Sequence, residues 1–342
     1  MILAELTKLM EPSFKLSKSI DLSGLWSDED QIVKRPPYEI EVVIGLSDWV
    51  YKELSKLDAY PNHLVNLLLP ATQALIKALE FWDFAGFEDE LHDRSHWDMV
   101  SISPHPQNRR YSTWVILIEL CRDLWEAIWE DNKVKAQSVL DIWRSFKHPV
   151  FRRLSLHAMT VKDVANTDVI VDYLLEDNGQ WLWSLATHRE VFRLLAVLWS
   201  ELDEVTAGQL VNTILKGPPR KMYRADLTEE EWEERFSRDV WLMLSKLQSF
   251  GGILPTNAVE ALQQLTSDYP LWALQEGERD EFTHWMETGS GLEVDITLDE
   301  LFEKKFQISS NIYLRKTGYM AKAGLINLGL AAKTTGKRPL KF

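Results

Sequence analysis

Apolar residues recur along most of the chain at intervals of three and four, which is the spacing of one face of an α-helix. Residues 111–129 follow this pattern, and so do residues 61–82, where Pro70 predicts a kink or two shorter helices. The alternation typical of strands is nearly absent. Its best example, residues 38–46, fits a buried helix equally well. The pattern therefore predicts a helical protein.

Residues that favour helix ends mark the boundaries of these segments. Asp131 is placed to cap the helix that follows it, and Pro149 to occupy the first turn of the next one. Thr228 and Glu231 have the spacing of a capping box, and Thr256 is placed to cap a later helix. The helices are joined by short loops, and no fixed period links them. The predicted fold class is therefore all-α, an irregular helical-repeat (solenoid-like) array.

The composition supports this prediction. Only 15 of the 342 residues are glycine, so the chain has few positions suited to tight turns at positive φ. This disfavours β-sandwiches and nucleotide-binding α/β folds. The tryptophans mostly fall at helical spacing on apolar faces, where packing in the core is their usual role. The examples are Trp125, Trp129, Trp181, Trp183 and Trp241.

Charge divides the chain into two parts. The net charge is −14, but residues 1–303 carry 29 basic and 52 acidic side chains, whereas residues 304–342 carry nine basic and no acidic ones. An acidic body repels phosphates, so nucleic-acid binding by residues 1–303 is not expected. We predict a helical array over 1–303, with a possible subdivision near 160–180 or 217–226, and a basic tail of uncertain structure over 304–342.

The single cysteine, Cys121, lies among apolar residues and is expected to be a buried small hydrophobe. One thiol forms neither an internal disulfide nor a cysteine-based metal cluster. The first residues lack the basic segment followed by an apolar segment that is typical of a secretory signal peptide. No stretch approaches the roughly 20 apolar residues of a membrane span. The sequence therefore predicts a cytoplasmic protein that does not contact a membrane.

Motifs that would indicate an enzyme are missing from the sequence. It holds no G-x-G-x-x-G, no complete phosphate-binding loop and no G-x-S-x-G, so no cofactor and no catalytic residue is predicted. His92 and His96 have the spacing of two metal ligands on one helix, but the residue after His92 is Asp93 rather than glutamate, and no metal is predicted. His148 is expected to cap a helix, and His157 to pack in the core or bond a backbone carbonyl.

Two proline-bounded loops form basic islands on the acidic body, residues 101–110 and 216–224. Rigid loops on a helical scaffold commonly carry recognition, so they supply the candidate partner-binding residues: His105, Gln107, Asn108, Arg109, Arg110, Arg220, Lys221 and Arg224. The structural alternative is that Gln107 and Asn108 cap the following helix and that the arginines form surface ion pairs.

Six sequence motifs follow one another along the chain in this order: "SISPHPQN", "WVILIELCRD", "HPVFRRLSLHAM", "ILKGPPRKMYRADLTEEEWEERFSRDVWLMLSKL", "YPLWAL" and "DEFTHWM". Over residues 1–290 this series resembles the C-terminal helical region of large bacterial anti-phage proteins. Those proteins join a sirtuin-like NADase or another effector, often with a STAND-type NTPase, to a helical-repeat sensor. The resemblance carries over no catalytic residue.

The resemblance implies that the helical region recognises a phage protein and releases an effector. This chain shows no effector or NTPase sequence, so such domains are expected in cis or in trans, with this chain as a fragment or a stand-alone sensor. The tail also departs from the family, either as a genuine basic tail or as a frame-shifted end.

The sequence as a whole predicts a non-catalytic helical interaction or sensor domain that recognises a protein partner, a phage component in an anti-phage defence system. No small-molecule substrate is evident. Two alternatives stay open. One is an α/α-barrel glycoside hydrolase with a carboxylate pair in a tryptophan-lined cleft. The other is a structural linker of a larger assembly.

Overall fold

The computed structural model describes residues 2–18, 38–57, 60–86, 93–105, 107–251 and 253–274. All of them belong to the first of two compact units, residues 1–287. The second unit, residues 288–342, contains the predicted basic tail, which lies outside the described residues together with its proposed boundary at residue 303.

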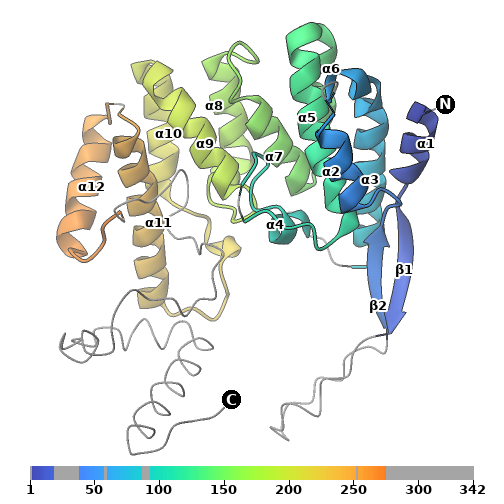
Figure 1. Ribbon diagram of the computed structural model, residues 1–342. Helices are drawn as coiled ribbons and strands as arrows, with labels where there is room; N and C mark the ends of the chain where they lie inside the picture. The colour runs from blue at the N-terminus through green and yellow to red at the C-terminus, as the bar shows by residue number, and fades with distance from the viewer. Residues whose placement is uncertain are drawn as a thin grey trace, which may run out of the picture. The chain divides into compact units, whose positions relative to one another are not determined.

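The chain is mostly helical, as predicted (Figure 1). The described residues form twelve α-helices, five 3₁₀ segments and one pair of strands. In chain order these are α1 (Ile2–Leu9), β1 (Ser13–Lys18), β2 (Tyr38–Val43), α2 (Asp48–Ser55), η2 (Asn62–Leu67), α3 (Leu68–Phe84), α4 (Ser95–Asp98), η3 (Thr113–Val115), α5 (Ile116–Asp131), α6 (Lys133–Ser145), α7 (Pro149–Ala158), α8 (Thr167–Leu175), η4 (Glu176–Leu182), α9 (His188–Leu198), η5 (Trp199–Glu201), α10 (Glu204–Lys216), η6 (Arg220–Met222), α11 (Glu229–Ser249) and α12 (Thr256–Asp268).

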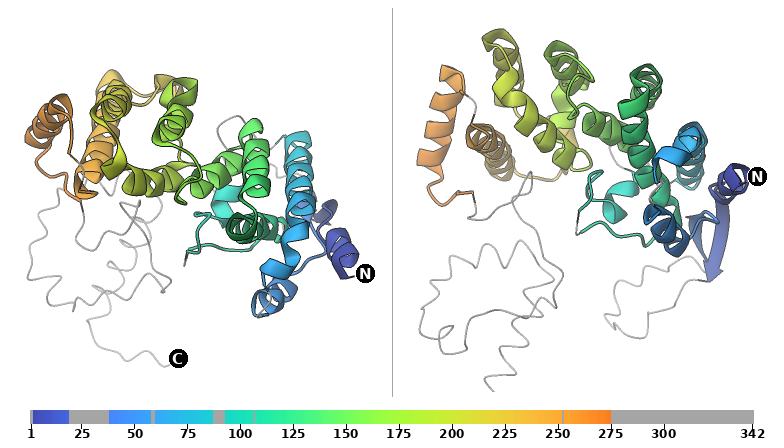
Figure 2. Two further views of the ribbon diagram at one scale, coloured as in Figure 1. Left: turned by 90° about the horizontal axis from the view of Figure 1, so that it is seen from above. Right: turned by 45° about the horizontal axis from the view of Figure 1, so that its top comes forward.

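Many of the helices contact the second helix along the chain as well as their direct neighbour. Helix α3 packs on α5, α5 on α7, α7 on α9, α8 on α10, α9 on α11 and α10 on α12. Figure 2 shows the same succession of helices from two further directions. These contacts link helices that are close to one another along the chain.

Two apolar clusters fill the interior of this unit. The first extends from Leu6 to Val164 and the second from Leu156 to Leu262, so the change from one to the other falls at α7. All ten residues of α7 are buried. The region around residues 217–226, by contrast, lies between two helices that contribute to the same cluster. The tryptophans behave as the sequence predicts, since Trp125, Trp129, Trp181 and Trp241 are buried, whereas Trp183 is half-buried.

Local signals placed some helix ends correctly and missed others. The capping box of Thr228 and Glu231 forms at the start of α11, and Pro149 is the first residue of α7. The cap of α6 was predicted one residue too early. Asp131 is the last residue of α5, and the Oδ1 atom of Asn132 accepts from the Lys135 amide at 3.0 Å. Asn132 provides the same hydrogen bond as aspartate and sits at the turn itself.

Two further helix predictions need correction. Thr256 is the first residue of α12 rather than its cap, and the preceding Pro255 provides no side-chain hydrogen bond. Near Pro70 the chain forms two pieces, as expected, but the division falls earlier. The 3₁₀ segment η2 ends where α3 begins, at Leu68, so Pro70 lies in the first turn of α3. Backbone N–H groups in the first turn of a helix have no acceptor within the helix, so the missing N–H of proline removes no hydrogen bond there.

The combined segment Asn62–Phe84 is long and apolar enough to cross a membrane by length and composition alone. The prediction that no stretch approaches a membrane span therefore needs correction for this segment, on length and composition. In the structure its α3 portion packs on α5 and buries residues on that side, among them Leu75 and Leu79.

The strand-like segment 38–46 resolves as a strand rather than a helix. Its first six residues form β2, which pairs antiparallel with β1, a strand that the apolar pattern did not reveal. The register places Phe14 opposite Val42, and the Phe14 ring stacks on Phe81 of α3 with 4.4 Å between centroids. This contact fixes the base of the hairpin to the helical body.

Candidate functional site: an acidic pocket on helix α5

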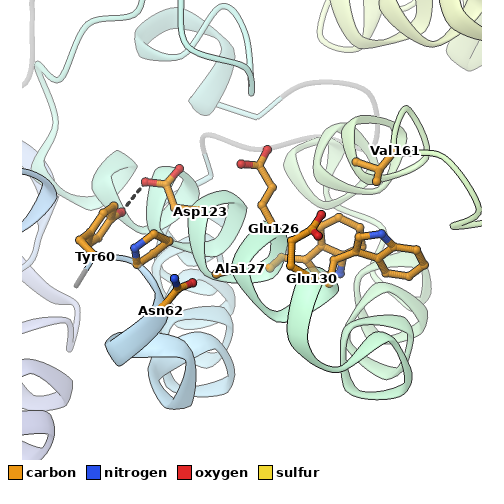
Figure 3. A pocket seen from close by; sticks show the side chains of 10 residues that line it. Tyr60, Asn62, Asp123, Glu126, Ala127, Glu130 and Val161 are labelled. Carbon is orange, nitrogen blue, oxygen red and sulfur yellow. Dashed lines mark hydrogen bonds between the residues drawn. The ribbon is translucent and has the colours of Figure 1, made fainter. Parts of the chain in front are cut away.

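A cavity of about 540 Å³ opens on the C-terminal half of α5 (Figure 3). One wall comes from the chain before η2, another from α5 itself, and a third from the turn after α7. The lining residues are Tyr60, Pro61, Asn62, Asp123, Trp125, Glu126, Ala127, Trp129, Glu130 and Val161. The volume lies in the range typical of ligand sites in proteins.

Three carboxylates line this pocket, and all three belong to α5. Asp123, Glu126 and Glu130 are spaced by three and four residues, which places them on one side of the helix. Figure 3 shows Asp123 beside Tyr60, Glu126 between the two ends of the pocket and Glu130 beside the indole rings. No lysine or arginine lines the pocket. Its lining is therefore acidic along one wall.

Asp123 is held by neutral and charged donors. Its Oδ2 atom accepts from the Tyr60 hydroxyl in a short hydrogen bond and from the Tyr51 hydroxyl at 3.0 Å, and its Oδ1 atom accepts from Arg122 Nε at 2.7 Å. Burial, reinforced by the charge of Asp123, raises the pKa of both tyrosines far above the usual range. Both hydroxyls therefore stay protonated and act as donors to the carboxylate.

Glu126 connects the pocket to the loop of residues 101–110. Its Oε1 atom lies 2.8 Å from His157 Nε2, and the other ring nitrogen of His157 lies 3.2 Å from Ser103 Oγ. Burial opposes ionisation of Glu126, but the hydrogen bond and charge of His157, together with the charge of Arg122, hold the pKa of Glu126 below its usual value. His157 was expected to bond a backbone carbonyl or only to pack, and it instead joins two side chains.

Two stacked indoles form the apolar part of the pocket. The rings of Trp125 and Trp129 lie 5.6 Å apart at an angle of 16°, and Trp125 Nε1 donates to the Ala136 carbonyl at 2.9 Å. The ammonium of Lys133, from the first turn of α6, stands 5.0 Å from the centre of the Trp129 ring. The indole of Trp129 thus already faces a cation.

This arrangement suits binding of a positive group better than acid–base chemistry. A glycosidase needs two carboxyl groups on opposite sides of the scissile bond, whereas these three come from one side of one helix. Glu126, with its lowered pKa, is ionised at neutral pH and is not a proton donor there. Among the described residues, no group of three or more His, Cys, Asp or Glu side chains is arranged to hold a metal ion.

The loop of residues 101–110, predicted to bind a partner, is fastened to itself by Asn108. The Oδ1 atom of Asn108 accepts from the Ser101 amide at 3.0 Å, and its Nδ2 atom donates to the carbonyls of Ser101 at 2.9 Å and Ser103 at 3.3 Å. Asn108 therefore closes the loop and does not cap the helix after it. The Gln107 amide donates to His105 Nδ1 at 3.1 Å, and the N-cap position of the following 3₁₀ segment η3 is Ser112 rather than Gln107.

The two arginines of this loop differ in their contacts. Arg110 donates to Asp48 at 2.8 Å and to Glu119 at 3.0 Å, and its guanidinium lies 5.0 Å from the centre of the Tyr51 ring. The Arg109 amide donates to the Asp98 carbonyl at 2.5 Å. Arg110 thus forms ion pairs within the protein, with the partly exposed Asp48 and the buried Glu119, rather than the purely surface ion pairs of the structural alternative.

A buried ion pair supports the loop from below. Arg153 and Glu190, 0% and 1% exposed at their side chains, lie 3.1 Å apart. Glu190 also accepts from the Ile102 amide at 2.7 Å, while Arg122 donates to the Ile102 carbonyl at 2.7 Å. The loop is therefore fixed by α5, α7 and α9 together.

The second predicted loop, residues 216–224, is supported by α11 instead. The Arg220 guanidinium donates to the carbonyls of Arg224 at 2.7 Å and Leu227 at 3.2 Å and lies 5.1 Å from the centre of the Trp232 ring. Arg224 forms an exposed ion pair with Asp226, and Lys221 is exposed. The two predicted islands thus rest on separate supports.

The remaining histidines give no metal site in the described residues. His96 Nδ1 lies 2.6 Å from the Asp93 carbonyl, and His92 lies outside the described residues. His148 stands at the N-cap of α7 but makes no capping hydrogen bond there, because its Nε2 atom contacts Asp83 at 2.9 Å.

Comparison with known proteins finds a distant similarity by sequence. The uncharacterized protein y4cA of Sinorhizobium fredii (strain NBRC 101917 / NGR234) is 23% identical over 227 residues, which cover 66% of this chain and 19% of that protein. The chain thus corresponds to about a fifth of the length of that relative. No family model matches the chain, and no solved structure matches it either.

Proposed function

We propose that this chain is a non-catalytic helical interaction domain that recognises a protein partner through the acidic pocket on α5. The observation that carries the proposal is the row of carboxylates Asp123, Glu126 and Glu130 beside two indoles in a cavity of about 540 Å³. A cavity with an apolar wall and a few converging charges is the usual form of a recognition site.

The helical scaffold belongs to the same proposal. We take it to be an irregular helical-repeat array, which the contacts between alternate helices support. Helical arrays present long surfaces to protein partners, because each unit contacts only its neighbours and leaves one side of the stack open. On such a scaffold, loops 101–110 and 216–224 would add contacts around the pocket's partner, with Lys221 and Arg224 among their exposed basic residues.

The partner that we propose is a phage protein, met in the bacterial cytoplasm as part of an anti-phage defence system. This part of the proposal rests on the resemblance of residues 1–290 to the sensor region of such proteins. The relative from Sinorhizobium fredii supports the idea of a larger whole, since this chain corresponds to 19% of its length. Effector and NTPase domains would act with this chain in cis or in trans.

The test is capture of partners by the tagged chain from bacteria with and without phage infection. The doubly substituted Glu126→Gln/Glu130→Gln variant should lose a phage protein that the unsubstituted chain retains. The matched control is Glu233→Gln/Glu260→Gln, which removes the same charge from exposed positions on α11 and α12. Equal capture by the pocket variant and the control would refute the role of the pocket, and glycosidase activity with a carboxylate-controlled pH profile would refute the non-catalytic assignment.

A further inference from the structure

We propose that two copies of this chain pair through the outer edge of strand β1 and so form a four-stranded antiparallel sheet. The inference goes beyond the proposed function and does not depend on the α5 pocket. Three features of the β1–β2 hairpin carry it: an edge without a backbone partner, an apolar face that is largely uncovered, and a strand sequence that is complementary to itself.

The outer edge of β1 is open to another strand. β1 pairs with β2 along its whole length, and β2 in turn packs on α3 and η3. Among the described residues, β2 is the only backbone partner of β1. Figure 1 shows the hairpin pointing away from the helices, with β1 on its outer side. Alternate N–H and C=O groups of β1 therefore face away from β2 and are available to a further strand.

One face of the hairpin carries apolar side chains from both strands. The register places six residues on this face, namely Phe14, Leu16, Lys18, Tyr38, Ile40 and Val42. Val42 belongs to the first apolar cluster, whereas Leu16, Ile40 and Tyr38 are 68%, 39% and 60% exposed. A two-stranded hairpin is only marginally stable, and additional strands that extend its apolar face stabilise it. The exposed part of this face is therefore the part that a wider sheet would bury.

The sequence of β1 favours a second copy of the same strand as the partner. In an antiparallel pair centred on Leu16, the two Leu16 side chains lie opposite each other. Phe14 then lies opposite the second copy's Lys18, and Lys15 opposite the second copy's Ser17. An ammonium beside an aromatic ring is an attractive contact. A register centred on Lys15 would instead place two ammonium groups opposite each other, which is unfavourable.

The charges and the direction of the hairpin are compatible with this pairing. Lysines on an edge strand commonly discourage pairing with another chain. Here Lys15 already has a counter-charge, because its Nζ atom lies 2.9 Å from Glu41 of β2. The helices adjoin one end of the hairpin (Figure 1), so an antiparallel arrangement places the helical bodies of the two copies at opposite ends of the sheet. The result is a dimer with two-fold symmetry, in which both copies use the same surface.

The first measurement is sedimentation equilibrium of the full chain over a series of concentrations, and we expect a monomer–dimer equilibrium. Leu16→Lys should weaken the dimer by at least about tenfold, because it removes the apolar contact on the symmetry axis and places two ammonium groups there. Leu16 is exposed in the single chain, so the substitution should leave the fold intact. The matched control is Val205→Lys in α10, which changes a residue that is 71% exposed and should leave association unchanged.

A second measurement tests the register by disulfide formation. In Leu16→Cys the two introduced thiols lie opposite each other, with their Cα atoms about 5 Å apart, so oxidation should link the dimer. The control is Ile40→Cys, on the same face but one strand further from the axis. Its two Cα atoms would be about 14 Å apart, too far for a disulfide. The natural cysteine, Cys121, is buried and should not take part.

Three results would overturn the inference. The first is a chain that stays monomeric up to about 1 mM, or that forms larger aggregates in place of a dimer. The second is a loss of affinity in Leu16→Lys no greater than that in Val205→Lys, which would place any dimer contact elsewhere. The third is equal disulfide linkage in Leu16→Cys and Ile40→Cys. Each of these results leaves the role proposed for the α5 pocket unaffected.

Discussion

Glu190 and Glu130 are both carboxylates on helices of this protein, but their surroundings are opposite. Glu190 is 1% exposed, and its oxygens accept from Arg153 and from the Ile102 amide. Glu130 is exposed at the end of α5 and pairs with none of the described residues. A buried carboxylate needs a counter-charge or hydrogen-bond donors, because removing the partner of a buried ion pair lowers the free energy of unfolding by about 3–5 kcal/mol. An unmatched carboxylate that water can reach costs little and remains available to a ligand.

The difference separates structural charge from charge available for recognition. The pair Arg153–Glu190 and the clamp of Asn108 keep loop 101–110 in place, whereas Glu130 of the acidic pocket forms no such pair. Substitutions in the two regions should therefore act on different measurements. Stability should respond to the first region and binding to the second.

The largest effect is expected from breaking the buried pair. Arg153→Met leaves Glu190 buried without its counter-charge and should lower the free energy of unfolding by about 3–5 kcal/mol, measured by urea denaturation. The double variant Arg153→Met/Glu190→Met should lose less than Arg153→Met alone, because no unpaired charge remains. A loss in the double variant equal to the sum of the two single losses would show that the pair is not coupled.

A smaller loss of stability is expected from the clamp in the loop. Asn108→Ala removes three hydrogen bonds that close the loop onto Ser101 and Ser103, and we expect the free energy of unfolding to fall by about 1–3 kcal/mol. Hydrogen exchange of the Ser101 amide should become faster in this variant. The control is Gln107→Ala, whose backbone amide still donates to His105. An unchanged exchange rate at Ser101 would contradict the clamp.

The lowered pKa of Glu126 gives a pH-dependent effect of modest size. A carboxyl group whose pKa is lower in the folded state than in the unfolded state stabilises the fold above the unfolded value, near 4.5. That contribution disappears as the pH falls through the folded pKa, which lies below 4.5. The stability advantage of the unsubstituted chain over Glu126→Gln should therefore be present near neutral pH and shrink below 4.5. Because the side chain is half exposed, we expect at most about 1 kcal/mol.

The smallest effect on stability, with the opposite sign, is expected at Glu130. Glu130→Lys places a positive charge at the C-terminal end of α5 and should raise the free energy of unfolding by about 0.3–1 kcal/mol. Glu260→Lys, inside α12, should not change the free energy of unfolding by a comparable amount. A loss of stability in Glu130→Lys would mean that the pocket is part of the fold's support.

The features that the sequence could predict are the local ones. The capping box of Thr228 and Glu231 and the role of Pro149 depend on residues within one turn, so their spacing alone is informative. The helical character of the chain depends on apolar spacing, which the structure bears out. The strand β1 was missed because its six residues are almost entirely exposed, and so they carry no one-sided apolar pattern strong enough to identify a strand.

The candidate site could not be predicted from local sequence patterns. Asp123, Glu126 and Glu130 have visible helical spacing, but on sequence alone they are indistinguishable from the polar face of any surface helix. What turns them into a pocket is Tyr60, 63 residues away from Asp123, and the turn at Val161. Likewise, Arg110 looked like a free docking residue because its partner Asp48 lies 62 residues earlier.

Helix α7 has a consequence for how the chain can be divided. Its Leu154 belongs to one apolar cluster and its Leu156 to the other, so the same ten residues seal both interiors. Cutting the chain after α7 would strip the cover from Leu156, and cutting before it would open the cluster around Leu154. The two halves should therefore melt together in a single calorimetric transition, and neither should be a good unit for expression by itself.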